Sequence, residues 1–119
     1  MNQYQNPQDL SLARQMAALA PGEAPQWLAF DHAAFRDGGQ IGRREREWIA
    51  LAVALTTQCA YCIDVHVKAA QRQGTTPAQI AEIAMVAAAV RAGGTLGHGL
   101  LALRLAAGES DAGADNRPP

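Results

Sequence analysis

Residues 47–66 read EWIALAVALTTQCAYCIDVH, and this stretch decides how the chain folds. Residues 48–55 are apolar almost all round a helix, and such a helix lies in a protein core or an interface. Thr56, Thr57 and Gln58 interrupt the apolar run, and either threonine is suited to cap a following helix. The pattern therefore predicts two consecutive helices joined by a short connection, with the cysteines at the start of the second.

The rest of the chain reads as further helices separated by Gly and Pro, and no alternating or β-branched run indicates a strand. Gly93 and Gly94 separate the last two helices, and Thr76–Gln79 is a start signal with an N-cap threonine followed by proline. The predicted fold class is all-α, a compact helical domain over residues 1–108 with a disordered polar tail over 109–119. About six helices are expected, over roughly 9–19, 24–35, 43–55, 59–72, 77–92 and 96–106.

Size and charge exclude several classes of protein. The chain has 119 residues, which fits one domain, and its net charge of −1 argues against a nucleic-acid partner. The first residues are polar, so no secretory signal is expected, and no apolar stretch reads as long and uninterrupted enough to span a membrane. We therefore expect a cytoplasmic protein without a membrane partner. Much of the apolar content is alanine, which buries little area, so we expect a homo-oligomer.

The chain holds two cysteines, and their spacing to a histidine and a carboxylate forms the set E-x11-C-x2-C-x3-H. Cys59, Cys62 and His66 are three and four residues apart, which places them on one face of a helix. The two sulfurs can then close a short disulfide, and the imidazole can accept the proton of Cys62. Glu47 comes from the preceding helix and is positioned to orient that imidazole. The set predicts thiol redox chemistry, because the nucleophile in such chemistry is a thiolate.

Other interpretations of the C-x-x-C pair remain open. The pair could be inert, or it could be part of a zinc site completed by His66 with His98 or His32. Three ligands on one helix suit a redox pair better than a tetrahedral site, so we expect no metal and no cofactor. The helix N-terminus favours Cys59 as the reactive thiol, whereas the histidine spacing favours Cys62.

The same four residues, with Phe35 before them and the Thr76 helix start after them, resemble the alkylhydroperoxidase AhpD-like proteins of the carboxymuconolactone decarboxylase family. The resemblance implies an all-α fold assembled into homotrimers or homohexamers. It also implies a thiol peroxidase or disulfide oxidoreductase in antioxidant defence. Cys62 would attack the peroxide, Cys59 would be its disulfide partner, and His66 with Glu47 would relay the proton.

What the resemblance implies about substrates follows from this chemistry. The substrate would be a small peroxide or disulfide, and the reductant a dihydrolipoamide-like thiol or a redox protein. Tyr61 stands where some members carry a further histidine, and we expect Tyr61, His98 and Trp48 to contribute to the substrate pocket. The family's decarboxylase branch, acting as a lyase on a small cyclic acid, is the alternative, and a non-enzymatic oligomeric metal-binding module is another.

Overall fold

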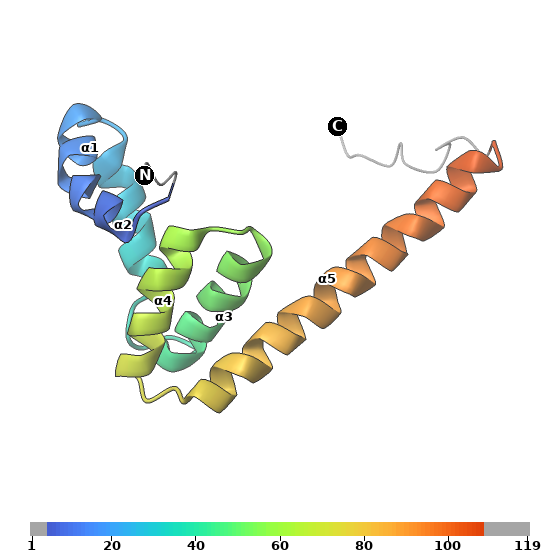
Figure 1. Cartoon of the computed structure of the whole chain (residues 1–119). Coiled ribbons are helices and arrows are strands. Elements are labelled where there is room, and N and C mark those ends of the chain that lie inside the picture. The colour runs from blue at the N-terminus through green and yellow to red at the C-terminus, as the bar shows by residue number, and fades with distance from the viewer. Residues whose placement is uncertain (1–4, 109–119) are drawn as a thin grey trace. The chain divides into compact units, whose positions relative to one another are not determined.

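A computed structural model describes residues 5–108, and the regular secondary structure of this part of the chain is entirely helical, with no strand (Figure 1). The predicted all-α class is therefore confirmed for the described residues. The predicted tail, residues 109–119, lies outside them. The elements are a 3-10 helix η1 and five α-helices: η1 Pro7–Leu12, α1 Ala13–Leu19, α2 Ala24–Ala34, α3 Arg43–Thr56, α4 Ala60–Arg72 and α5 Pro77–Ala106.

The last helix differs from the sequence prediction. The expected break at Gly93 and Gly94 is wrong, because α5 runs unbroken from Pro77 to Ala106 (Figure 1). A glycine inside a helix costs only about 1 kcal/mol relative to alanine, and the Ala- and Leu-rich neighbours are strong helix formers. The two short helices predicted for residues 77–92 and 96–106 are therefore one.

The continuity of α5 also corrects the expectation about membrane-spanning segments. By length and composition alone, α5 is long and apolar enough to cross a membrane. The charged residues Glu82, Arg91 and Arg104, however, divide this helix into shorter uncharged runs. The longest of these runs lies between Arg91 and Arg104, and it is shorter than the roughly 20 residues that a bilayer needs. An uncharged run of that length is more typical of a helix covered by protein.

The chain divides into two units, Met1–Ala87 and Ala88–Pro119. The first unit holds η1, α1 to α4 and the first third of α5, and it contains the dithiol. The second unit, within the described residues, is the remainder of α5. This part of α5 exposes large apolar side chains, among them Leu96, Leu100 and Leu103.

The core of the first unit lies between α3 and α4, which run side by side as a helical hairpin (Figure 1). The buried apolar residues on these two helices are Leu51 and Ala54 of α3 and Ala69 and Ala70 of α4. Alanine permits a close approach of the two helices but buries little area. The acidic Glu47 is as deeply buried as Leu51, at 1% exposed.

The connection between α3 and α4 places the first cysteine. The amide of Cys59 donates to the carbonyl of Ala54 at 3.1 Å, and Gln58 adopts a left-handed conformation with φ 58°. This is the Schellman arrangement that ends many helices, with glutamine where glycine is usual. The threonines do not cap α4 as expected. The hydroxyls of Thr56 and Thr57 donate back to the carbonyl of Val53, both at 2.9 Å.

The start of α5 agrees with its sequence signal. The amide of Gln79 donates to the hydroxyl of Thr76 at 3.2 Å, and the amide of Thr76 donates to the side-chain carbonyl of Gln79 at 2.9 Å. This reciprocal capping box, with Pro77 at the first helical position, is the one that the sequence predicted. It fixes the residue at which α5 begins.

Candidate active site

Cys59 and Cys62 are joined as a disulfide across the first turn of α4, with their Cα atoms 5.2 Å apart. Cys59 is the N-cap of that helix, and its sulfur accepts a hydrogen bond of 3.2 Å from the amide of Cys62. In the dithiol form, a thiolate at Cys59 would face the positive end of the helix dipole, which stabilises negative charge. The cap that we expected from threonine is thus provided by the redox residue itself.

His66 lies one helical turn beyond Cys62 and contacts Glu47. The imidazole Nδ1 is 2.8 Å from Glu47 Oε2. The Glu47 side chain is 2% exposed and that of His66 is 19% exposed. A carboxylate only accepts hydrogen bonds, so the nitrogen that faces an ionised Glu47 carries the proton, and Nε2 is left as the acceptor.

Two further side chains surround this pair. Arg43, one turn before Glu47 on α3, donates from Nε to Glu47 Oε1 at 3.1 Å, and its Nη2 forms an ion pair with the same oxygen, also at 3.1 Å. Phe35, the C-cap of α2, stacks on the imidazole of His66 with the ring centroids 5.0 Å apart and the planes 21° apart. Phe35 was noted in the sequence within the family resemblance, without a contact to His66, and Arg43 was not expected at the site. The i,i+4 spacing of Arg43 and Glu47 was a signal that could have found the first.

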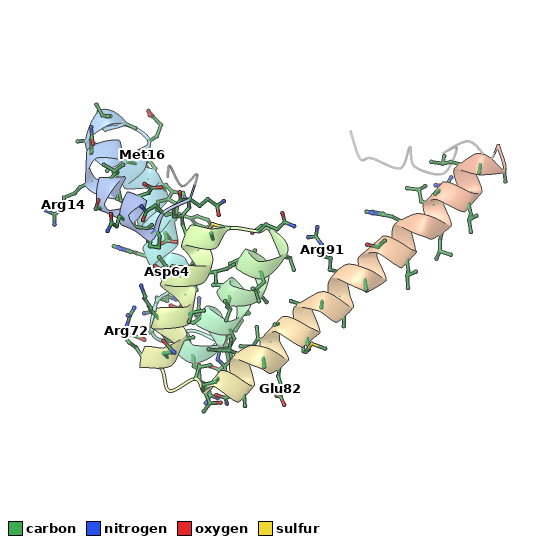
Figure 2. The ribbon with its side chains drawn as sticks, viewed as in Figure 1. Arg14, Met16, Asp64, Arg72, Glu82 and Arg91 are labelled. Carbon is green, nitrogen blue, oxygen red and sulfur yellow. A yellow bond between two sulfur atoms is a disulfide. The ribbon has the colours of Figure 1, made fainter. Side chains whose placement is uncertain are left out.

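A cavity of about 370 Å³ opens beside this group, between the end of α2 and the faces of α3 and α4. Phe35 and His66 form part of its wall, and neither cysteine lines it. Arg72, labelled at the end of α4 in Figure 2, lies at its edge. The other lining residues are Asp31, His32, Arg36, Asp37, Arg43, Glu47, Val65 and Ala69.

The three residues expected in the substrate pocket lie elsewhere. The hydroxyl of Tyr61 donates to Asp9 Oδ2 at 2.7 Å, which ties η1 to the start of α4 and raises the pKa of the phenol. The indole of Trp48 donates to the hydroxyl of Thr75 at 2.8 Å and lines a separate apolar hollow against α5. His98 belongs to the second unit. Their part in substrate binding stays a prediction.

Residues 5–108 contain no group of three or more His, Cys, Asp or Glu side chains that could hold a metal ion. Both sulfurs are engaged in the disulfide. His66 is held by Glu47, and His32 lines the cavity rather than joining the cysteines. Within the described residues the site therefore consists of a disulfide at the start of α4 and a histidine–glutamate contact further along the same helix.

An all-α fold with a C-x-x-C pair at the start of one helix and a buried glutamate–histidine contact defines the class of protein. The sequence profile of the carboxymuconolactone decarboxylase family matches residues 21–105. The chain is also 41% identical over 103 residues to a protein of Paracoccus denitrificans named "Uncharacterized protein 4 in cox locus", covering 80% of this chain and 90% of that relative. The chain belongs to the carboxymuconolactone decarboxylase family.

Proposed function

We propose that this protein is a thiol-dependent peroxidase or disulfide oxidoreductase of the AhpD-like type. One observation carries the proposal: a disulfide closes the first turn of the helix that also presents His66, and that histidine is held by the buried Glu47. A dithiol with an adjacent proton acceptor has the groups that peroxide reduction requires. Antioxidant defence is the role that such chemistry serves.

The reaction begins from the reduced pair. Nε2 of His66 takes the thiol proton of Cys62, and the Glu47 carboxylate stabilises the imidazolium through Nδ1–H. The thiolate attacks one peroxide oxygen, the O–O bond breaks, and the departing alkoxide takes the proton from His66. Cys62 is then a sulfenic acid. The Cys59 thiolate attacks its sulfur, the S–S bond forms and hydroxide leaves as water after accepting a proton.

A dithiol substrate completes the cycle. Its thiolate attacks the protein disulfide, and a second attack releases the oxidised dithiol and restores both protein thiols. The N-cap position of Cys59 favours this step, because the helix terminus stabilises Cys59 when it leaves as a thiolate. The structural position of each cysteine thus suits a different part of the cycle, Cys62 for attack and Cys59 for resolution.

Peroxide consumption with dihydrolipoamide as reductant tests the proposal. We expect Cys62→Ser to abolish turnover and Cys59→Ser to leave a sulfenic acid on Cys62 that dimedone traps and mass spectrometry locates. Unchanged consumption in Cys62→Ser contradicts the proposal. A trapped sulfenic acid on Cys59 in the Cys62→Ser protein would exchange the roles of the two sulfurs.

The cavity beside His66 favours a second candidate, a lyase acting on a small cyclic acid. The cavity contains an imidazole held by a carboxylate together with arginines, but neither sulfur lines it. Proton transfer by His66 and binding of a substrate carboxylate by an arginine need no thiol. The Cys59→Ser/Cys62→Ser double variant separates the two functions, because decarboxylation of a lactone acid would survive it and peroxide reduction would not.

The apolar surface of α5 supports a proposal about assembly and location. Large apolar side chains, among them Leu96, Leu100 and Leu103, lie on the part of α5 beyond the first unit. Because the uncharged run of α5 is short for a bilayer, a cytoplasmic homotrimer or homohexamer in which copies cover α5 fits better than a membrane anchor. Light scattering after gel filtration is expected to give three or six protomers. Cosedimentation with phospholipid vesicles would contradict this.

A further inference from the structure

Four side chains from three elements form a closed circuit of contacts around the acid–base pair. Arg43 bonds Glu47, Glu47 bonds His66, and His66 stacks on Phe35. The guanidinium of Arg43 closes the circuit by lying over the ring of Phe35, 5.9 Å from its centroid. We refer to Arg43 and Phe35 together as the clamp.

Arg43 determines which oxygen of Glu47 is available to His66. Its Nε–H donates to Oε1 and its Nη2 forms an ion pair with the same oxygen, so the guanidinium occupies Oε1 while Oε2 contacts the imidazole. The carboxylate is buried, and a buried carboxylate oxygen without a partner is costly. With Arg43 removed, Glu47 gains by rotating, by accepting a proton or by recruiting water, and each of these changes loosens its hold on His66.

Phe35 determines the plane of the imidazole. A stacked ring opposes rotation of His66 about its last side-chain torsion, which is otherwise broad. Phe35 also covers one face of the imidazole and separates that face from water. The hydrogen bond to Glu47 fixes one ring nitrogen, and the stack fixes the direction in which the other nitrogen points.

We propose that Arg43 and Phe35 are positioning residues that lock His66 in the Nδ1–H form, with Nε2 held ready to accept the thiol proton. This inference rests on the proposed thiol chemistry for its effect on rate. The locking itself is a property of the folded protein whatever reaction follows. The other charged or titratable groups that line the cavity beside His66 are Asp31, His32, Arg36, Asp37 and Arg72.

The chain provides a matched control for Arg43 one residue away. Arg44 also pairs with a glutamate, Glu45, at 2.9 Å, and its guanidinium also lies over an aromatic ring, 4.8 Å from the centroid of Trp48. The contact types are the same, but none of them reaches His66. Arg43→Met and Arg44→Met therefore remove the same kind of interactions and differ in whether the acid–base pair is touched.

The first measurement is the tautomer of neutral His66, read from the nitrogen chemical shifts of the oxidised, 15N-labelled protein. We expect the wild-type and Arg44→Met proteins to show the Nδ1–H form, and Arg43→Met to show a mixture of both tautomers. Arg43→Lys keeps the charge but not the paired N–H groups, so an intermediate shift is expected. A pure Nδ1–H form in Arg43→Met overturns the role of Arg43.

The second measurement is steady-state peroxide reduction. Misplacing the base without changing the peroxide site lowers kcat and leaves KM nearly unchanged. We expect kcat to fall about tenfold in Arg43→Met and in Phe35→Leu, at the lower end of the range for acid–base groups. Phe35→Tyr, which keeps the stacked ring, is expected to restore the rate. An equal loss in Arg44→Met, or no recovery in Phe35→Tyr, would show a merely structural role.

The two measurements separate failure of this inference from failure of the proposed function. If the wild-type protein does not reduce peroxide, the proposed function is refuted, yet the tautomer comparison still tests whether Arg43 and Phe35 position His66. If the wild-type protein reduces peroxide but Arg43→Met changes neither the tautomer of His66 nor kcat, the proposed function stands and the positioning role of the clamp is overturned. If Arg43→Met does not fold, as judged by circular dichroism, Phe35→Leu with Phe35→Tyr decides the same question from the other side of the imidazole.

Discussion

Replacing Glu47 by alanine removes a buried carboxylate that accepts a hydrogen bond from Arg43 Nε, forms an ion pair with Arg43 Nη2 and contacts His66 Nδ1. Breaking a buried ion pair costs about 3–5 kcal/mol when a partner is left without compensation. Here the partners are only partly buried, with Arg43 34% and His66 19% exposed, so each regains some contact with water. We therefore expect about 3 kcal/mol, the low end of the range, or roughly a hundredfold loss in the folding constant.

Urea denaturation followed by circular dichroism measures this cost. The oxidised protein is used so that the disulfide is constant, and the protomer concentration is fixed because assembly shifts apparent stability. Glu47→Gln keeps an acceptor for one partner but presents an N–H group to the other, so it is expected to cost less, about 1–2 kcal/mol. Glu45→Ala is the control, since Glu45 pairs with Arg44 on the outside of the same helix.

The outcome that refutes the reasoning is also definite. If Glu47→Ala lowers the free energy of unfolding by less than about 1 kcal/mol, the carboxylate is not held by desolvated partners. A double-mutant cycle with Arg43→Met adds a second criterion. Because the two side chains share one contact, their effects should be non-additive by at least about 0.5 kcal/mol. Additive effects would mean that Arg43 does not depend on Glu47 for its position.

Three further predictions address other parts of the chain. Gln58 holds a left-handed conformation that costs a non-glycine residue about 1–2 kcal/mol, so Gln58→Gly should raise the urea midpoint, and a lowered midpoint would contradict the Schellman turn. Gly93 and Gly94 lie inside α5 with open space where a Cβ would be, so alanine at either should add about 1 kcal/mol and increase the helical signal. A loss of stability would indicate a break there. The hydrogen bond to Asp9 raises the pKa of Tyr61 in the folded protein. The stability that this bond contributes is therefore fully present below the pKa of tyrosine in the unfolded chain, near 10, and is lost as pH rises through the folded pKa. Asp9→Asn should move the ionisation of this tyrosine at 295 nm to lower pH, and an unchanged curve would show that the bond is absent in solution.

Sequence reasoning worked best where structure is local. The capping box at Thr76 and the helix of residues 43–56 needed only the pattern of neighbouring residues, and both were found. It failed at Gly93 and Gly94, because glycine can either end a helix or be tolerated inside one. Only the summed propensity of the flanking alanines and leucines favours continuity, at a small margin per residue.

The candidate site shows the same division. The sequence suggested that Glu47 reaches the cysteine-bearing helix, but it gave the neighbouring arginines no role. Whether Arg43 points to water or to Glu47 depends on how closely α3 and α4 approach, which is set by buried alanines on both helices. Phe35 was noted as part of the family resemblance, but its stack on His66 could not be predicted, because that contact joins elements far apart in the chain.

The sequence by itself determined that Cys62 and His66 share one helical face, because a spacing of four residues aligns on any α-helix. It expected Cys59 on the same face, whereas the structure places Cys59 just before the helix, as its N-cap. It also placed the disulfide partners within one turn. The tertiary structure alone decided that Glu47 is buried against His66 and that Arg43 and Phe35 enclose the pair. It also decided that the cavity beside His66 is lined by neither cysteine. These are contacts between separate helices, and their geometry follows from packing, which no local pattern specifies.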